Sequence, residues 1–477
     1  MINQKEKMDT ICAIATPAGG ALGIIRVSGP EAITAADRIF RPRVGAPLSQ
    51  RAASSLTFGN VVVPQTDETV DEVLVSLFRA PHSYTGEDSV EFSCHGSYYI
   101  LNKVVELLLA QGCRMARPGE YTERAFLNGK MDLSQAEAVA DLIASTTEAN
   151  HRMAMQQMRG GFSKELRTLR DQLLHITSLL ELELDFSDHE ELEFASRSEL
   201  LALAERIRNH ISTLCQSFRL GNALKRGVPV ALVGETNAGK STLLNALVGE
   251  ERALVSNVHG TTRDTIEETV NVGGTLVRFI DTAGIRETSD TVERMGIERT
   301  FDKMAEADIV LWLIDLTVYQ AQYDELAEKI GAQVQGKHLV VLLNKTDLVS
   351  ESTINEAKQY ISGQLNNAVP TPMLLTLSAQ SGSGLDQLKQ LLAASLSTLQ
   401  AENNSTGTIV SNLRHYEALS AALAATDRVI EGLHQGLSGD FVSQDLRECI
   451  YHLSDIVGEV TTDQVLGNIF KHFCVGK

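Results

Sequence analysis

Long hydrophobic runs are missing from this sequence of 477 residues, and none approaches the ~20 apolar residues that a membrane-spanning helix needs. Cysteine is scarce as well. The six cysteines include no C-x-x-C pair, and the chain is far longer than a disulfide-stapled scaffold. We therefore expect no membrane segment, reduced thiols and a cytoplasmic protein. With 10 prolines and 35 glycines, collagen-like and proline-rich architectures are excluded too.

Positive charge is also in short supply. Lysine and arginine total 42 against 61 aspartates and glutamates, which gives a formal net charge of −19. Because binding along a nucleic acid relies on clustered Lys and Arg, this composition argues against a protein that coats nucleic acid, although it is compatible with a local basic groove. Apolar residues make up 43% and charged residues 22%, which is ordinary for globular proteins. The length predicts about three domains.

The first 130 residues predict an α+β domain. Short apolar runs alternate there with Gly, Pro and Ser, and residues 100–111 form one amphipathic helical pattern. The predicted strands are Ile11–Ala15, Gly23–Val27, Val61–Val63, Val73–Phe78 and Ser89–Cys94.

Two stretches of helical spacing flank the centre of the chain. Apolar residues recur at this spacing over 134–220, as at Leu166, Leu169 and Leu173, and helical texture returns over 409–475 after a polar segment, 401–408, that we interpret as a linker. We predict one helical domain, split into 131–226 and 398–477, whose two parts pack together. Eight carboxylates between Glu181 and Glu199 indicate either a metal or partner site or, as like-charge runs more often do, a solvated helix end and loop.

Residues 227–397 alternate apolar strands with helical stretches. This order predicts an inserted domain with a doubly wound, mostly parallel sheet. The predicted strands are Pro229–Val233, Leu276–Ile280, Ile309–Asp315, Leu339–Leu343 and Met373–Leu377.

The segment Gly234–Ser241 has the pattern G-x-x-x-x-G-K-S between a predicted strand and a predicted helix. Such a loop wraps phosphates with backbone N–H groups, while Lys240 can reach the β- and γ-phosphates and Ser241 can ligate Mg²⁺. The candidate nucleotide-binding residues here are Asn237, Ala238, Gly239, Lys240, Ser241 and Thr242.

Three further segments follow in the order of a guanine-nucleotide site. Asp281-Thr282-Ala283-Gly284 ends a strand, where an Asp can hold Mg²⁺ through water and a Gly amide can meet the γ-phosphate. Asn344-Lys345-Thr346-Asp347 follows a later strand, and its Asp carboxylate can accept both N1–H and N2–H of guanine, which adenine does not offer. Ser378-Ala379 follows the last strand, where the base is contacted. This set resembles GTP-binding proteins and implies GTP rather than ATP.

The segment between the phosphate loop and Asp281 is a candidate switch. Thr262 is the best candidate to complete Mg²⁺ coordination when γ-phosphate is present, and such loops order with GTP and relax after hydrolysis. The residues of this segment assigned to the nucleotide site are Ser256, Asn257, Val258, His259, Gly260, Thr261 and Thr262.

Ile285 follows Gly284 and has no polar group to orient an attacking water. Glu293 is a candidate for that role, although from the residues alone it is equally well interpreted as one exposed carboxylate among many. The transition state also needs positive charge near the phosphates. Arg263 or Arg286 can supply it, or a K⁺ ion held by Asn237 and backbone oxygens of 256–261.

Four segments outside this site resemble the MnmE (TrmE) family of tRNA-modifying GTPases, and the resemblance covers essentially the whole chain. These segments are Ala15–Pro17 leading to Ile25–Gly29, Tyr84–Asp88 with Cys94–Gly96, Ala116–Lys130, and Phe473–Lys477.

The resemblance implies a homodimer formed through an N-terminal domain similar to the folate-binding domains of one-carbon enzymes. It implies a flavoprotein partner, MnmG, which carries FAD and joins the chain in a heterotetramer. Together they would add an aminomethyl-type (carboxymethylaminomethyl) group at C5 of the wobble uridine of certain tRNAs, using 5-formyltetrahydrofolate or a related tetrahydrofolate. It also implies K⁺-dependent GTP hydrolysis that accompanies dimerisation of the G domains.

The resemblance also implies roles for single residues. Glu293 matches the family's water-orienting residue. Arg and Lys suit the carboxylates of folate, and a carboxylate suits the pterin. The matched folate positions are Arg26, Glu91, Lys130 and Lys477, and the matched K⁺ ligands are Asn237, Ser256, Thr261 and the carbonyl of Val258.

Cys474 matches a C-terminal cysteine that the family needs for tRNA modification, whereas its chemistry alone is also compatible with a small buried side chain. Two departures stand out. The loop Pro17–Gly23 is one residue shorter than the family's Gly-rich turn, and Glu235-Thr236 places an extra negative charge near the phosphates. The alternative function is a GTP-dependent switch that assists ribosome assembly, which would need neither Arg117–Lys130 nor Cys474–Lys477.

Overall fold

The computed structural model describes residues 9–17, 19–185, 197–249, 268–280, 304–335, 337–365, 372–403, 408–460, 462–471, 473–474 and 476. The chain divides into two compact units. Unit 1 consists of Met1–Ile143, Gln156–Leu179 and Leu446–Lys477. Unit 2 consists of Ala144–Met155 and Leu180–Asp445.

Unit 1 is built on a seven-stranded sheet with the order β3-β4-β5-β6-β2-β1-β7. Neighbouring strands are antiparallel except for the short parallel pair of β1 and β7. Its strands are β1 (Ile11–Ile14), β2 (Leu22–Ser28), β3 (Phe40–Pro42), β4 (Ser55–Val62), β5 (Thr69–Phe78), β6 (Ser89–His95) and β7 (Arg114–Met115).

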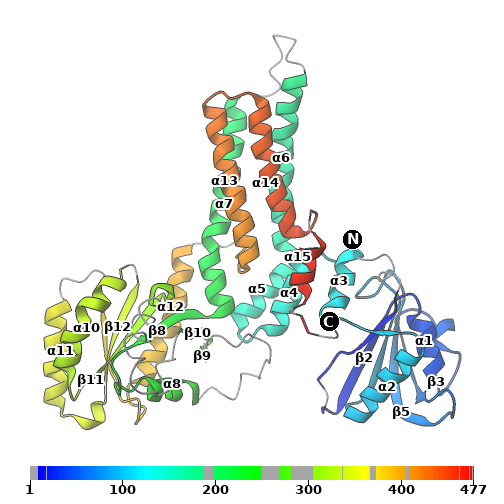
Figure 1. Ribbon diagram of the computed structural model, residues 1–477, viewed down its shortest axis with the longest axis horizontal. Helices are drawn as coiled ribbons and strands as arrows, with labels where there is room; N and C mark the ends of the chain where they lie inside the picture. The colour runs from blue at the N-terminus through cyan, green and yellow to red at the C-terminus, as the bar shows by residue number, and fades with distance from the viewer. Residues whose placement is uncertain are drawn as a thin grey trace. The chain divides into compact units, whose positions relative to one another are not determined.

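Helices α1 (Ala32–Ile39) and α2 (Tyr98–Ala110) cover one face of this sheet (Figure 1). The alternation along β5 explains why: Val73, Val75 and Leu77 are buried on the covered face, while Glu72 and Leu74 lie on the other. The short 3-10 helix η2 (Leu48–Gln50) packs against α1.

The remaining helices of unit 1 come from distant parts of the chain. Leu133 and Ala136 pack against Leu466 and Phe470 in a small core, and the hydroxyls of Ser134 and Ser163 lie 2.8 Å apart. These helices are α3 (Glu120–Leu127), α4 (Leu133–Ala144), the end of α5 (Glu148–Met158), most of α6 (Gly161–Asp185), the second half of α14 (Gly439–Val457) and α15 (Asp463–Phe470).

Unit 2 contains a six-stranded sheet with the order β13-β12-β11-β8-β10-β9, parallel except for the edge strand β9. Every residue of β8 and β11 is buried, as expected for central strands covered on both faces. The strands are β8 (Val228–Val233), β9 (Glu268–Val272), β10 (Thr275–Ile280), β11 (Ile309–Asp315), β12 (His338–Asn344) and β13 (Met373–Thr376).

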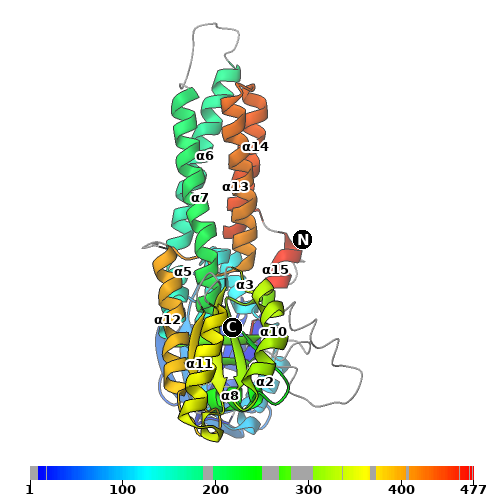
Figure 2. The same cartoon turned by 90° about the vertical axis from the view of Figure 1, so that its left-hand side faces the viewer.

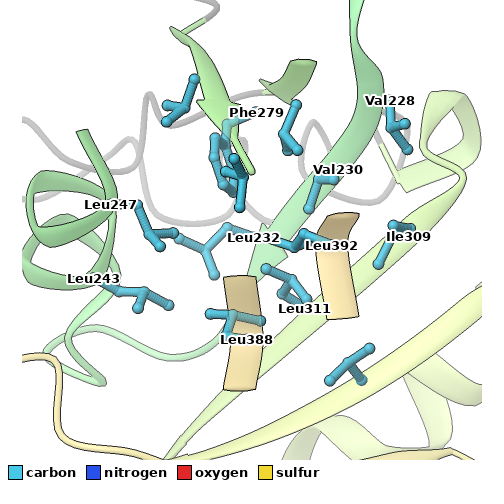
Figure 3. Close-up of a cluster of buried hydrophobic side chains, with 14 of the residues drawn as sticks. Val228, Val230, Leu232, Leu243, Leu247, Phe279, Ile309, Leu311, Leu388 and Leu392 are labelled. Atoms are coloured by element: carbon cyan, nitrogen blue, oxygen red, sulfur yellow. The ribbon is translucent and has the colours of Figure 1, made fainter. Parts of the chain in front are cut away.

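Two hydrophobic cores lie on the two faces of this sheet. On one face, side chains of β8, β10 and β11 meet Leu243 and Leu247 of α8 and Leu388 and Leu392 of α12 (Figure 3). On the other face, Trp312 is fully buried and stacks on Tyr323. The helices and the 3-10 helix of the domain are α8 (Lys240–Gly249), α10 (Tyr319–Gln333), η4 (Thr346–Leu348), α11 (Glu351–Leu365) and α12 (Leu385–Asn403).

Helices α7 (Arg197–Arg226) and α13 (Leu413–His434) lie side by side in unit 2 (Figures 1 and 2). The backbone N–H of Val410 donates to the Ser217 hydroxyl at 3.0 Å. Residues 197–226, which precede the six-stranded sheet in the sequence, therefore contact residues 409–434, which follow it.

The fold class expected from the sequence is confirmed, and each of the five strands predicted in each sheet overlaps an observed strand. The overlap is smallest for β4, which begins at Ser55 and shares only Val61 and Val62 with the predicted strand Val61–Val63. Strands β3, β7 and β9 and helices α1 and α3 were not predicted. The linker expected over 401–408 is wrong at its start, because α12 continues to Asn403. Within the described ranges, no helix is both long and apolar enough to cross a membrane.

Candidate functional site

The phosphate loop lies between β8 and α8, as the sequence predicts, and its backbone requires glycine. Gly239 has φ +102°, and a Cβ added there would lie 2.3 Å from Nδ2 of Asn344. A Cβ at Gly234 would lie 2.4 Å from the carbonyl oxygen of Leu313. Asn237 is exposed and has φ +64°, in the left-handed region. The loop is therefore held tightly against the neighbouring strands.

Lys240 is the first residue of α8, and its ammonium group folds back onto the loop. Its Nζ donates to the carbonyl oxygens of Gly234 at 2.5 Å and Glu235 at 2.9 Å. Burial lowers the pKa of Lys240, and the charge of Glu235 opposes this shift. Ser241 and Thr242 follow in the first turn of α8, where backbone N–H groups have no partner within the helix. This helix end is suited to bind phosphate.

Asn344 joins three of the predicted motifs. Its side-chain amide donates to the carbonyl oxygen of Ala238 at 2.8 Å, and its side-chain oxygen accepts from the backbone N–H of Ala379 at 3.0 Å. Asn344 and Ser378 are buried, and the Ser378 hydroxyl accepts from the N–H of Ser381 at 3.1 Å. The structure thus brings together the phosphate loop, the Asn344–Asp347 segment and Ser378-Ala379.

Lys345 has φ +67° and forms an ion pair with Asp315 at the end of β11, with 2.6 Å between Nζ and Oδ2. Burial favours the neutral form of Asp315, but hydrogen bonds from Lys345 and Thr317 outweigh it and lower the pKa of this carboxyl. Thr346 and Asp347 lie on η4, and the Asp347 side chain is exposed. Asp315 was not predicted as a site residue, although it ends the strand beside the one that carries Asn344.

Several predicted site residues lie outside the described part of the chain. They include the candidate switch Ser256–Thr262, the Asp281–Gly284 segment with Ile285, Glu293, both candidate arginines Arg263 and Arg286, and Lys477. Of the candidate Mg²⁺ and K⁺ ligands, the structure describes Ser241 and Asn237. Among the described residues, no group of three His, Cys, Asp or Glu side chains could hold a metal. Residues 186–196 of the acidic segment lie outside the described part of the chain.

A second cluster of predicted residues lies on the sheet of unit 1. Arg26 of β2 faces Glu91 of β6, and its Nε donates to Glu91 at 2.8 Å. The guanidinium carbon lies 5.5 Å from the ring centres of both Tyr84 and Tyr121. The Tyr121 hydroxyl donates to the carbonyl oxygen of Arg26 at 2.8 Å. Arg26 is therefore fixed by one carboxylate and two aromatic rings.

Lys130 lies beside the segment that carries Tyr84. Its Nζ donates to the carbonyl oxygen of Pro81 at 2.9 Å, and its Cγ would lie 3.3 Å from a Cβ at Gly86. Tyr84 and Tyr121 were not predicted as site residues, but both belong to segments that resemble the family. Both rings lie near Arg26 because of the fold, since the two tyrosines are 37 positions apart in the sequence.

The C-terminal residues reach the same sheet. Gly476 has φ +94°, its carbonyl oxygen accepts from Nη1 of Arg26 at 3.4 Å, and a Cβ there would lie 2.6 Å from the carbonyl oxygen of Ile14. The backbone N–H of Gly119 donates to the carbonyl oxygen of Cys474 at 3.3 Å. The Cys474 thiol is exposed, so a buried packing role for it does not hold.

Buried ion pairs tie two of the quoted segments together. Arg124 donates to Glu87 at 3.1 Å and to Glu120 at 3.1 Å, and Arg114 donates to both oxygens of Glu120 at 2.7 and 2.9 Å. Burial opposes ionisation of Glu120, but hydrogen bonds from Arg114 and the Arg117 N–H, with the charge of Arg124, lower the pKa of Glu120 to about 2. This network positions α3, which carries Tyr121.

Comparison with known proteins shows the family of the whole chain. The family model described as "MnmE helical domain" matches residues 133–474, and the one described as "GTP-binding protein TrmE N-terminus" matches residues 10–130. A relative from Bacteroides fragilis (strain YCH46), named tRNA modification GTPase MnmE, is 58% identical over 470 residues, which are 98% of this chain and 99% of the relative. This chain belongs to the MnmE family.

Other MnmE relatives extend over the same length. The one from Phocaeicola vulgatus, also named tRNA modification GTPase MnmE, is 53% identical over 510 residues and covers 100% of both chains. Among solved structures, Era in complex with MgGDPNP and nucleotides 1506–1542 of 16S ribosomal RNA aligns with 42% of this chain and 66% of its own. Its identity is 26%, and its TM-score of 0.29 is too low to bear on the assignment.

The structure gives contacts for the two features in which this MnmE-family chain is expected to depart from the family pattern, the loop 17–23 and Glu235. In the shorter loop, the N–H of Gly19 donates to the carbonyl oxygen of Gly96 at 3.0 Å, and the N–H of Gly96 donates to that of Ala21 at 3.2 Å. In the phosphate loop, burial and the neighbouring Glu325 raise the pKa of Glu235, which Gln322 and Lys240 oppose. Ionisation of the Glu235 carboxyl is therefore less favourable than ionisation of a carboxyl that is free in water.

Proposed function

We propose that this chain is a GTPase of tRNA modification that hydrolyses GTP in a K⁺-dependent manner. We further propose that it works with the flavoprotein MnmG to add a carboxymethylaminomethyl-type group at C5 of the wobble uridine. One observation carries the nucleotide assignment: Asn344 bonds both Ala238 of the phosphate loop and Ala379 of the last loop. The three segments that recognise phosphate and guanine are thereby held as one unit.

The described residues fit a guanine nucleotide bound with Mg²⁺. Gly239 takes a positive φ without strain, and its missing Cβ leaves room for Asn344. Backbone N–H groups of such a glycine loop can face phosphate oxygens. Lys240 would exchange its two loop carbonyls for phosphate oxygens, which are better partners for an ammonium group. Ser241 would hold the Mg²⁺ with Thr262, and Asp347 would accept the two N–H donors of guanine.

We propose that Glu293 and Lys240 carry out GTP hydrolysis. The Glu293 carboxylate would hold the attacking water, a role that Ile285 cannot fill. The positive charge needed in the transition state would come from K⁺ bound by Asn237, Ser256, Thr261 and the carbonyl of Val258. Asn237 is exposed at the phosphate loop, which supports its part in that set.

The Arg26 cluster fits a tetrahydrofolate such as 5-formyltetrahydrofolate. A carboxylate such as Glu91 can accept from the amidine edge of a pterin, and Arg26 would orient it there through their 2.8 Å hydrogen bond. Cations such as Lys130 and Lys477 can pair with the glutamate carboxylates. Tyr84 and Tyr121 add aromatic faces beside Arg26. When bound, the folate would supply the one-carbon unit. A GTP switch for ribosome assembly needs neither this cluster nor the docked Cys474, so we favour the modification enzyme.

The partners follow from the same assignment. We propose a cytoplasmic homodimer that joins MnmG in a heterotetramer, with FAD on MnmG, and tRNA as the substrate. The net charge of −19 supports a division in which MnmG makes much of the contact with tRNA, because an acidic chain repels a polyanion.

Steady-state GTP hydrolysis in KCl and NaCl at equal ionic strength tests this proposal. We expect at least tenfold faster turnover in KCl, which corresponds to about 1.4 kcal/mol of transition-state stabilisation. Glu293→Ala is expected to bind GTP normally and to hydrolyse little of it in either salt, whereas Lys240→Ala loses binding. Equal rates in the two salts would reject the K⁺ assignment, and normal turnover of Glu293→Ala would reject its role.

A further inference from the structure

We propose that Asp315 is a positioning residue for guanine recognition, which acts by holding the ammonium group of Lys345 away from Asp347. Neither the sequence motifs nor the family comparison assigns a role to Asp315. The inference rests on the proposed function, because it concerns the same nucleotide site, and it adds the residue that keeps the guanine acceptor open.

The register of the sheet places the two partners together. Asp315 is the last residue of β11 and lies directly opposite Asn344, the last residue of β12. Lys345 is the next residue, and its left-handed backbone at φ +67° turns the chain at the strand end. Its Nζ lies 2.6 Å from Oδ2 of Asp315, a carboxylate whose side chain is 9% exposed. A charge-assisted bond this short and shielded resists competition from water.

Asp315 is itself held rigidly, so it can fix its partner. Its other oxygen, Oδ1, accepts from the backbone N–H of Thr317 at 2.9 Å and from the Thr317 hydroxyl at 2.8 Å. The backbone N–H of Asp315 donates to Oε1 of the buried Gln322 at 2.7 Å. The backbone N–H of Leu316 donates to the carbonyl oxygen of Asn344 at 3.1 Å. The end of β11 is thus bonded to the segment that it positions.

The need for such an anchor follows from the spacing of charges in Asn344–Asp347. Lys345 is two residues from Asp347, and opposite charges at that separation attract one another when neither has another partner. If the ammonium group of Lys345 paired with the Asp347 carboxylate, it would compete for that carboxylate with the N1–H and N2–H donors of guanine. Among the described residues, Lys345 pairs with Asp315, and Asp347 keeps an exposed side chain. The ion pair therefore protects the base-binding carboxylate.

A double-mutant cycle on the full-length protein tests this mechanism. Asp315→Asn keeps an oxygen that can accept from Thr317 but removes the charge that holds Lys345, and Lys345→Met removes the ammonium group while keeping the apolar stem. We expect Asp315→Asn to weaken binding of fluorescent GDP about tenfold. In the Lys345→Met background, the same change is expected to leave the Kd unaltered, because Asp315 acts only through the ammonium group.

Two controls separate this role from a loss of structure. Asp308→Asn removes the carboxylate that pairs with Arg219 at 2.7 Å in the same unit, and we expect it to leave the GDP Kd unchanged. The emission of Trp312, the single tryptophan of the chain and fully buried on β11 three residues before Asp315, reports whether each variant is folded. If Asp315→Asn has the Trp312 emission of the wild type, the variant is folded and its GDP affinity can be compared with that of the wild type.

The outcomes distinguish the inference from the function on which it rests. An equal loss from Asp315→Asn in both backgrounds would show a purely structural role for Asp315 and would overturn the inference, while wild-type binding upholds the nucleotide site. A GDP affinity of Asp315→Asn equal to that of the wild type would overturn it as well. A wild-type protein that binds no GDP would overturn the proposed function together with the inference.

Discussion

Glu120 is a carboxylate whose ionisation stabilises the fold around α3. Its folded pKa of about 2 lies below the ordinary value of 4.5, and its side chain is 2% exposed. A depressed carboxyl pKa contributes stability that is fully present above pH 4.5 and is lost as the pH falls toward 2. The shift corresponds to about 3 kcal/mol. We therefore expect Glu120→Gln to reduce the free energy of opening α3 at pH 7 by about this amount.

Protection of the α3 backbone amides from hydrogen exchange measures this effect. The difference between wild type and Glu120→Gln is expected to be full at pH 7 and to shrink progressively between pH 4.5 and pH 2. Glu106→Gln is the matched control, because Glu106 pairs with Lys103 on α2 but is 68% exposed; we expect a change below about 0.5 kcal/mol. Equal α3 protection in wild type and Glu120→Gln at pH 7 would contradict the role of this charge.

Single residues also mark the limit of what the sequence predicts. Asn344 and Lys240 were predicted because their motifs have a fixed spacing and a known chemistry. The contact between Arg26 and Glu91 depends on the pairing of β2 with β6, and the two tyrosines around Arg26 come from a loop and from α3. Such contacts join segments far apart in the chain, so spacing alone could not indicate them.

At the scale of elements, the C-terminal segment depends on one glycine. Gly476 has φ +94°, and an added Cβ would lie 2.6 Å from a backbone oxygen that cannot move easily. We expect Gly476→Ala to displace this segment from Arg26 and to weaken 5-formyltetrahydrofolate binding at least tenfold, measured by titration calorimetry. Gly112 is a matched control, because it has the same φ of +94° and nothing within 4 Å of its added Cβ. Equal affinities of Gly476→Ala and Gly112→Ala would contradict this docking role.

The strands that were not predicted share a physical reason. Central strands such as β8 and β11 are buried on both faces and form continuous apolar runs that are easily recognised. The edge strand β9 pairs with β10 through the Gly273-Gly274 turn, but Glu268, Thr269 and Asn271 dilute its apolar pattern. Strand β7 has only two residues, and its pairing with β1 is a consequence of the fold. Short and edge strands thus carry too little local signal.

At the scale of the whole molecule, the two candidate sites lie in different units. The phosphate loop and Asn344 belong to unit 2, whereas Arg26 and Cys474 belong to unit 1. GTP hydrolysis and the modification chemistry are therefore expected to be separable by mutation, and we expect tRNA modification to need both sites. This expectation distinguishes the proposed enzyme from a switch whose output is carried by the nucleotide site alone.

Cys474→Ser tests that separation. The thiol is exposed and far in sequence from the phosphate loop, so we expect K⁺-stimulated GTP turnover to stay within about twofold of wild type, a difference below about 0.5 kcal/mol. Modified wobble uridine is expected to disappear from the tRNA of cells that carry only this variant, as measured by mass spectrometry of nucleosides. Lys240→Ala should lose both activities, and Cys215→Ser, at a partly buried thiol, should keep both. A normal nucleoside profile in Cys474→Ser cells would mean that modification proceeds without this thiol. The exposed sulfur would then have no part in the chemistry.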